Sequence, residues 1–244
     1  MERREYLGSL VAAGGFTGCV TSESEQTPTG EPIPDSSVDL QGSVMYRRTV
    51  DRFGVAGPTN DQFAFVSVPE STAGDPPSAF ELRIGGRSFE PIEKPNWREL
   101  LPVGEHRMYT TEEPHGRLLF DVPTVEAESA ALVHDGTTHP VADTVVDQLE
   151  RAPEFVVQSV ETPDSVARGT DITVSLDVAN EGSSDGTFRG MVQLDSLPRP
   201  FEKPVSAGAS ASISVTLTAR GEDAASLDVL WGRDSRSIRV QITE

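Results

Sequence analysis

Cysteine is nearly absent from this 244-residue chain, which holds only Cys19. A single thiol excludes an intramolecular disulfide and leaves no second cysteine for a zinc or redox pair. Lysine is also scarce, because Lys94 and Lys203 are the only lysines among 20 basic residues, against 39 acidic residues. The resulting formal net charge of -19 repels nucleic acid, which we therefore do not expect as a partner. The chain also lacks an apolar run long enough to span a bilayer as a helix.

The acidic residues are spread along the chain, and arginine takes the place of lysine. This composition is similar to that of proteins from salt-loving archaea, in which salt screens the self-repulsion over about 3 Å near molar ionic strength. An acidic protein adapted to low salt is the alternative interpretation.

The first residues have the pattern of a targeting segment, with two arginines before the mildly apolar run "LGSLVAAGGFTGC". Arg3 and Arg4, followed by Glu5, Tyr6 and Leu7, resemble the twin-arginine export motif. "FTGC" resembles the lipobox of exported lipoproteins, although Phe16 replaces the usual aliphatic residue. These resemblances imply a signal peptide over 1–18 and lipidation of Cys19 as the new N-terminus. The alternative is a Cys19 buried in a first strand.

Residues 19–37 follow as a tether, because "VTSESEQTPTGEPIPDSS" is rich in Ser, Thr, Glu and Pro and has no apolar period. Such a composition predicts a disordered segment. The resemblance to lipoproteins and the tether together imply a chain held by lipid on the outer face of the cytoplasmic membrane.

Residues 38–152 predict an antiparallel β domain, because short apolar stretches alternate with turn residues. "QFAFVSV" places Phe63 and Phe65 on one face of a strand and Ala64 and Val66 on the other. Gly85-Gly86 and Asp135-Gly136 predict hairpin turns. "DTVVDQLERAP" is the one helical candidate, with Asp143 as its N-cap and Val145, Val146 and Leu149 on one side.

This segment resembles an Ig-like domain found in bacterial and archaeal lipoproteins, through the runs "FAFVSV", "FELRIGGRSFEP", "GRLLFDVP" and "ALV". The resemblance implies a fold without an assigned activity.

Residues 153–244 predict a second Ig-like domain, because seven strand-like runs follow one another at short, regular spacing. The runs are "FVVQSV", "DITVSLDVAN", "GTFRGMVQL", "KPVSAG", "SASISVTLTA", "SLDVLWG" and "SIRVQIT". Val174, Leu176 and Val178 should point inward. The stretch from Gly169 to Gly182 resembles cell-surface, adhesion-type Ig-like domains. The fold class expected is therefore all-β, with two consecutive Ig-like antiparallel β-sandwich domains.

The histidines provide the strongest candidate for chemistry. All four lie in the first domain, and "VHDGTTHP" places His134 and His139 across a hairpin with Asp135 between them. Imidazole and carboxylate suit a transition metal or zinc, but no HExxH or facial-triad spacing is present. Exposed loop histidines are the simpler interpretation. Acidic turns such as "SSDGTF" leave calcium open, although none matches the EF-hand loop.

No nucleophile elbow or phosphate-binding loop is present, so we expect no enzyme activity and no cofactor. The sequence favours a non-enzymatic, lipid-anchored envelope protein that binds another envelope protein or a surface glycan, or acts as a spacer. The alternative is a metal- or substrate-binding accessory subunit of an envelope exporter or respiratory complex, using His134, Asp135 and His139.

Overall fold

The computed structural model of the chain describes residues 29–49, 52–93, 97, 99–101, 107–194, 197–220 and 223–244. These residues form an all-β protein in which α1 (Asp143–Val146) is the one α-helix of the described part. The all-β fold class expected from the sequence is confirmed. Within the same residues, no helix has the length and apolar character needed to cross a membrane.

The first unit consists of three sheets stacked in layers. The central sheet has the order β1-β4-β8, and its two neighbours have the orders β10-β9-β5-β6 and β3-β2-β7. The strands are β1 Val38–Gln41, β2 Val44–Thr49, β3 Arg52–Ala56, β4 Gln62–Ser67, β5 Phe80–Ile84, β6 Arg87–Phe89, β7 Glu99–Leu101, β8 Arg117–Val122, β9 Ala130–His134 and β10 Thr137–Pro140. Short 3-10 turns lie at Asp35–Ser37, Glu70–Thr72 and Pro77–Ala79.

Strand β4 is buried on both faces, which explains why it is apolar at almost every position. Phe63 and Phe65 pack into a core with Tyr46 of β2. Ala64 and Val66, which point the opposite way, pack into the core formed with β5 and β9. A strand with hydrophobic neighbours on both sides must be apolar at successive positions. The opposite orientation predicted for the two pairs is confirmed, but the sequence did not predict the third layer.

Both hairpin turns predicted from the sequence are present. Gly85 and Gly86 have φ values of 53° and 78°, and they join β5 to β6. Asp135 and Gly136 have φ values of 45° and 76°, and they join β9 to β10. Two successive residues with positive φ are typical of the tight turns whose twist matches that of antiparallel strands.

The predicted tether is wrong in its last nine residues, 29–37. The backbone N–H of Gly30 donates to the carbonyl of Thr138 at 2.9 Å. Ile33 is only 3% exposed and packs in the core formed with β5 and β9. Ile33 is an apolar residue in a polar run, and its burial against Val141 fixes this stretch on the sheet. Residues 1–28, with Arg3, Arg4, Cys19 and the start of the tether, lie outside the described residues.

Helix α1 is shorter than the periodicity predicts, and its N-cap is Ala142 rather than Asp143. Turns continue the chain to residue 150. Val145, Val146 and Leu149 are buried on one side, as expected from their spacing.

The second unit is a β-sandwich of two sheets, with the orders β11-β13-β16 and β12-β18-β17-β14-β15. Its strands are β11 Phe155–Glu161, β12 Ser165–Ala167, β13 Asp171–Asn180, β14 Gly186–Leu194, β15 Leu197–Val205, β16 Ser210–Thr218, β17 Ala224–Trp231 and β18 Asp234–Thr243. Val174, Leu176 and Val178 are fully buried between the sheets, which confirms the predicted alternation.

Two strands of this unit differ from the sequence-based expectation. Strand β12 pairs in parallel with β18. Because it is only 3 residues long, its sequence pattern was too brief to be recognised. Strand β15 begins at Leu197 rather than at Lys203, because it contains prolines that usually argue against a strand. It lies at the edge of its sheet, where a missing N–H costs no ladder hydrogen bond.

The linker between the two units, residues 151–154, is held by the buried side chain of Asn180. Its Oδ1 accepts hydrogen bonds from the backbone N–H groups of Glu154 and Gly182, both at 3.1 Å. Its Nδ2 donates to the carbonyls of Ser184 at 2.9 Å and Val205 at 3.0 Å. Asn180 is 0% exposed, and its amide therefore connects the linker to the sandwich with these four bonds.

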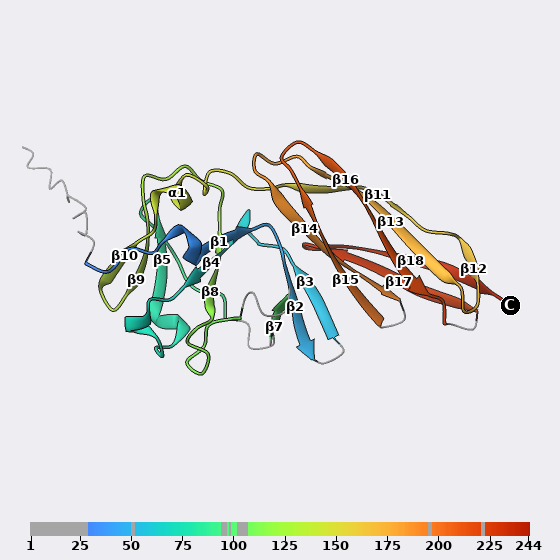
Figure 1. Ribbon diagram of the computed structural model, residues 1–244, viewed down its shortest axis with the longest axis horizontal. Helices are drawn as coiled ribbons and strands as arrows, with labels where there is room; N and C mark the ends of the chain where they lie inside the picture. Colours follow the sequence, from blue (N-terminus) through green and yellow to red (C-terminus); the bar gives the residue numbers. More distant parts are fainter. Residues whose placement is uncertain are drawn as a thin grey trace, which may run out of the picture.

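The two units also pack against each other beside the linker. The Nη1 group of Arg189 donates to the carbonyl of Ser43 at 3.3 Å, and the arginine side chain is 11% exposed. Met45 and Met191 are buried but belong to no core within either unit. They lie on β2 and β14, whose backbones approach each other. Figure 1 shows the resulting elongated shape, with β2 and β3 facing the second unit.

We predict that Asn180→Ala destabilises the protein by about 3 kcal/mol, because it leaves buried backbone groups without partners. Urea denaturation followed by circular dichroism measures the change. Asn60→Ala is the matched control, since the exposed Asn60 amide donates only to the carbonyl of Asp121, and its cost should stay under about 1 kcal/mol. Equal losses in the two variants would contradict the role given to Asn180.

Candidate functional site

The residues proposed for a metal site do not converge. His134 is partly buried, and its Nε2 lies 2.9 Å from a carboxylate oxygen of Asp75 rather than of Asp135. Its ring stacks on Phe80 with 4.6 Å between the centroids. Asp135 is exposed in the turn between the strands.

His139 is 3% exposed, and its role is structural packing. Its Nδ1 lies 3.0 Å from the carbonyl oxygen of Glu31. Its ring fills the space in which a side chain at Gly30 would lie, so the first described residues close over it. Among the residues that the structure describes, no group of three His, Cys, Asp or Glu side chains could hold a metal ion. The described fold therefore does not bring His134, Asp135 and His139 together as one group of ligands.

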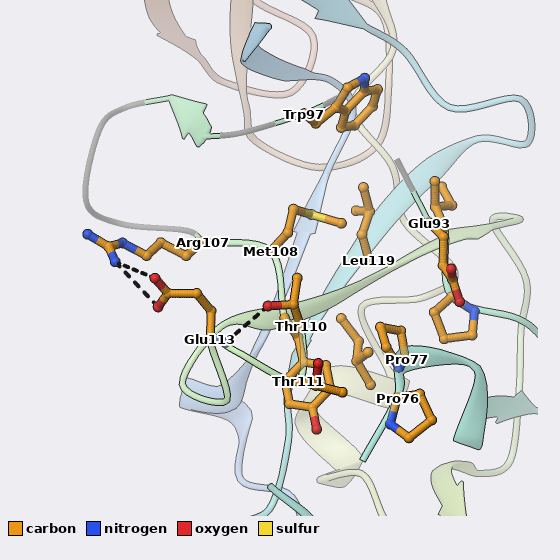
Figure 2. A pocket seen from close by; sticks show the side chains of 14 residues that line it. Pro76, Pro77, Glu93, Trp97, Arg107, Met108, Thr110, Thr111, Glu113 and Leu119 are labelled. Atoms are coloured by element: carbon orange, nitrogen blue, oxygen red, sulfur yellow. Dashed lines mark hydrogen bonds and ion pairs between the residues drawn. The ribbon is translucent and has the colours of Figure 1, made fainter. Parts of the chain in front are cut away.

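The first unit has a groove of about 660 Å³ on its surface. Leu118 and Leu119 of β8 form part of its lining. Figure 2 shows Trp97 at one end and Pro76 and Pro77 at the other. The groove is open to solvent and falls in the size range of small-ligand sites, about 300–1,000 Å³. We refer to it as the proline groove; its other lining residues are Pro91, Ile92, Glu93, Arg107, Met108, Tyr109, Thr110, Thr111 and Glu113.

One wall of the proline groove is attached to the start of β8. The N–H of Tyr109 donates to the carbonyl of Arg117 at 2.9 Å, and the N–H of Arg117 donates to the carbonyl of Arg107 at 2.7 Å. Gly116 is needed beside this wall, because a side chain there would overlap the backbone of Met108. The opposite wall is fixed by Ile92, whose N–H donates to the carbonyl of Leu119 at 2.6 Å.

Tyr109 connects two walls of the groove through its hydroxyl group. The hydroxyl donates to the carbonyl of Asp75 at 2.7 Å and accepts from the N–H of Gly74 at 3.0 Å. Its ring is 2% exposed and meets Phe80 edge to face. The segment that carries Pro76 and Pro77 is thereby held against the rest of the first unit.

Aromatic stacking and charge define the rest of the groove. Trp97 stacks on Tyr46 with 4.3 Å between the ring centroids and 13° between the ring planes. Its position is therefore set by the core that Tyr46 forms with β4. Arg107 pairs with Glu113 at 3.2 Å on one side. Glu93 lies on the other side, as Figure 2 shows, and no cation among the described residues is paired with it.

Sequence reasoning did not find this groove, because its walls come from segments that are far apart in the chain. The available signal was a concentration of prolines near an aromatic residue, in "DPPSAF" and "EPIEKPNW". Proline has no N–H to donate to a neighbouring strand, so such stretches favour turns and sheet edges over central strands.

Carboxylates elsewhere are held by neighbouring hydroxyl groups. On the outer face of the sheet β11-β13-β16, Ser212 donates to Asp177 at 2.6 Å and Ser159 donates to it at 2.8 Å. These two hydrogen bonds, the one from Ser212 first, lower the pKa of the Asp177 carboxyl below its usual value. Hydrogen bonds from Ser88 and Arg83 lower the pKa of Glu81 in the same way.

Comparisons with known proteins found partial likenesses to solved structures. No protein-family model and no curated protein matches the chain. A β-glucosidase from Listeria innocua, solved with gluconolactone, is 15% identical over 38% of this chain and 16% of its own, with a TM-score of 0.34. The CARDB domain of a Pyrococcus furiosus protein, solved with di-metal ions, is 12% identical over 37% of this chain and 89% of its own, with a TM-score of 0.33.

A Pseudomonas fluorescens alkylpurine DNA glycosylase bound to DNA is 13% identical over 39% of this chain and 32% of its own, with a TM-score of 0.32. The chain thus spans less than a fifth of the length of the β-glucosidase and about a third of that of the glycosylase. The sheets themselves show a β-rich protein whose second unit has β-sandwich architecture.

We predict that Tyr109→Phe loosens the wall that carries Pro76 and Pro77. The N–H of Gly74 loses its acceptor, so its hydrogen exchange should accelerate by about tenfold. Mass-spectrometric exchange over residues 72–80 measures the effect. Thr111→Ala, at an exposed lining residue, should leave this exchange unchanged. Unaltered exchange in Tyr109→Phe would show that the hydroxyl does not hold the wall.

We also predict that Ser212→Ala raises the pKa of Asp177 toward its ordinary value, because it removes the stronger hydroxyl donor. Since the folded-state pKa is lowered, this carboxylate contributes stability above its unfolded-state pKa and loses it as the pH falls through the folded-state pKa. Carboxyl NMR titration measures the shift. Ser214→Ala on the same strand should leave the titration where it is, and a shift of equal size there would refute the assignment.

Proposed function

We propose that this protein is a non-enzymatic, lipid-anchored cell-envelope protein that acts as a binding and spacer module on the outer face of the cytoplasmic membrane. The observation that carries the proposal is the position of the two chain ends. In Figure 1 the chain enters the fold at the end that holds β10 and finishes at the opposite end of the long axis. A lipid at Cys19 would therefore hold one end of an elongated molecule.

The chain between Cys19 and the fold is short. Residues 20–28 separate the cysteine from Thr29, whose N–H donates to the carbonyl of Thr138 on β10. Ten residue steps span at most about 35 Å when fully extended and about 17 Å as a flexible chain. The first unit would thus lie close to the lipid headgroups, and the second unit would be the outer one.

The contacts between the units support a spacer. Flexible linkers let domains reorient, and rotation about this linker would break the hydrogen bonds of Asn180 and expose Met45 and Met191. Units fixed in this way keep a constant distance between the anchor and the outer end.

The histidine contacts support a role other than catalysis. His134 pairs with the carboxylate of Asp75, and the buried His139 places its Nδ1 beside the backbone carbonyl of Glu31. The proline groove offers apolar lining and prolines, which suits binding rather than proton transfer.

The lipid anchor is tested by Cys19→Ala. We expect the wild-type chain in the washed membrane fraction and the variant in the soluble exported fraction, with a lipid-sized mass gain on a wild-type chain that begins at Cys19. Ser24→Ala, a change in the same polar segment, should behave as wild type. Equal membrane retention of Cys19→Ala and wild type would contradict the anchor.

A further inference from the structure

Strand β16 lies at one edge of the sheet β11-β13-β16, and its other side has no strand partner among the described residues. The N–H of Ala219, just beyond one end of the strand, donates to the carbonyl of Thr170 at 2.9 Å. Before the other end, the carbonyl of Ala209 accepts from the N–H of Asn180 at 2.9 Å. Because bonding alternates along an antiparallel strand, odd-numbered residues face β13 and even-numbered ones face the open edge. The residues with N–H and C=O groups directed to the open edge are Ser210, Ser212, Ser214, Thr216 and Thr218.

The other edges of the second unit carry features that hinder strand pairing. Strand β15 contains three prolines, and β12 is only 3 residues long. Strand β11 has a register shift between Val157 and Ser159. Strand β16 has none of these features, because its 9 residues, SASISVTLT, include no proline and no charge and keep an unbroken register with β13. A long, regular and unblocked edge is typical of a strand that pairs with another chain.

A second copy of β16 fits this edge completely. In antiparallel pairing about a two-fold axis at Ser214, every outward-directed residue meets an outward-directed residue of the second copy, so all their N–H and C=O groups gain partners. On the inner face, the partly buried Val215 would lie beside Ile213 of the second copy, which removes apolar surface from water. The pairs at the edge are Ser214 with Ser214, Ser212 with Thr216, and Ser210 with Thr218.

The lack of charge on β16 also favours a second copy. Two chains with a formal net charge of -19 repel each other, so they meet most readily at an uncharged surface. Asp171 and Asp177 lie on β13, one strand inward from the edge. In the paired sheet the β13 strands of the two copies would be three strand spacings apart, about 14 Å. That distance exceeds the screening length of about 8 Å at physiological salt.

We propose that β16 of one molecule pairs antiparallel with β16 of a second copy, about a two-fold axis at Ser214, and that the two molecules are anchored in facing membranes. The pairing itself does not need the anchor. The arrangement in facing membranes rests on the lipid anchor and the orientation proposed above.

The direction of β16 within the molecule requires facing membranes. Its first end lies near the linker, because Ala209 bonds to Asn180, which also holds Glu154. Its last end lies toward β12, at the end of the molecule far from the first unit in Figure 1. Antiparallel pairing places the first end of one strand beside the last end of the other. The two first units, and the lipids near them, would therefore lie at opposite ends of the pair.

A single pair of this kind is weak in dilute solution. Two edge strands bury less than the area of a standard stable interface, about 1,200–2,000 Å². Many pairs between two membranes act together, however, and their combined strength exceeds that of one pair. The outer units would thus hold two membrane surfaces together by contact between identical molecules.

Disulfide mapping in the full-length Cys19→Ala chain tests the pairing, because a cysteine placed on the second unit is then the one thiol. Paired residues of such a sheet have Cα atoms about 5.5 Å apart, within the range for a disulfide. We expect Ser214→Cys to form a linked dimer on mild oxidation. Ser212→Cys and Thr216→Cys should link about tenfold more when mixed with each other than alone, because neither residue faces its own copy.

Thr173→Cys is the matched control for the disulfide mapping. Thr173 is exposed one strand inward from the edge, so its thiols would stay too far apart to link. Equal yields from positions 214 and 173 would overturn the pairing. Equal yields from the mixed and the separate variants at positions 212 and 216 would overturn its register.

Charge exchange at the two-fold axis tests the arrangement in facing membranes. Phosphatidylcholine vesicles that carry the full chain on a maleimide lipid at Cys19 should cluster. Ser214→Glu and Ser214→Arg should each reduce clustering by about tenfold, because like charges then meet at the axis. Mixing the two populations should restore it, whereas Thr173→Glu should cluster as wild type does. Clustering that Ser214→Glu leaves unchanged, or that mixing does not restore, would overturn the proposal.

The anchor and the pairing can fail separately. Disulfide mapping needs no membrane, and the maleimide lipid attaches at Cys19 whether or not the cell lipidates it. If Cys19→Ala stays in the membrane as wild type does, the natural anchor fails while both tests still report on the pairing. The expected disulfide pattern without clustering of wild-type vesicles would overturn the arrangement in facing membranes alone.

Discussion

The shape of this protein depends on one buried amide. Asn180 lies where β13 ends, and its four hydrogen bonds connect the linker, the following turn and the end of β15. An amide is suited to this position because it offers donors and acceptors at once, and it is neutral, so its burial costs much less than that of a charge. The contact of Arg189 with Ser43 and the burial of Met45 and Met191 add to this connection between the units.

The first unit depends on a strand that is covered on both sides. Because β4 is buried on both faces, one sheet can carry two further sheets, and β2 and β3 are placed where they meet the second unit. The same layering positions Trp97, because Trp97 stacks on Tyr46, and Tyr46 packs in the core between β2 and β4. The proline groove is therefore a consequence of how the three layers end at β8 rather than of a separate binding domain.

Local signals in the sequence predicted much of the fold. Alternation indicated the inward residues of β13, and the Gly-Gly and Asp-Gly pairs indicated both hairpins, because these features depend only on backbone geometry. Long-range partners were not predictable. The pairing of His134 with Asp75 and the burial of Ile33 against Val141 depend on which strands meet, so neither could be predicted from the sequence. The groove was missed for the same reason.

The most direct test of the account is the height of the two units above the membrane. With Cys19 lipidated, a cysteine at Ser36 or Ser165 is the one free thiol of the chain and accepts a fluorescent donor, while the lipid carries the acceptor. Ser36 lies in the first unit, and Ser165 begins β12 near the far end of the molecule in Figure 1. The account predicts strong energy transfer from position 36 and much weaker transfer from position 165. Equal transfer from both positions would contradict an elongated molecule anchored at one end.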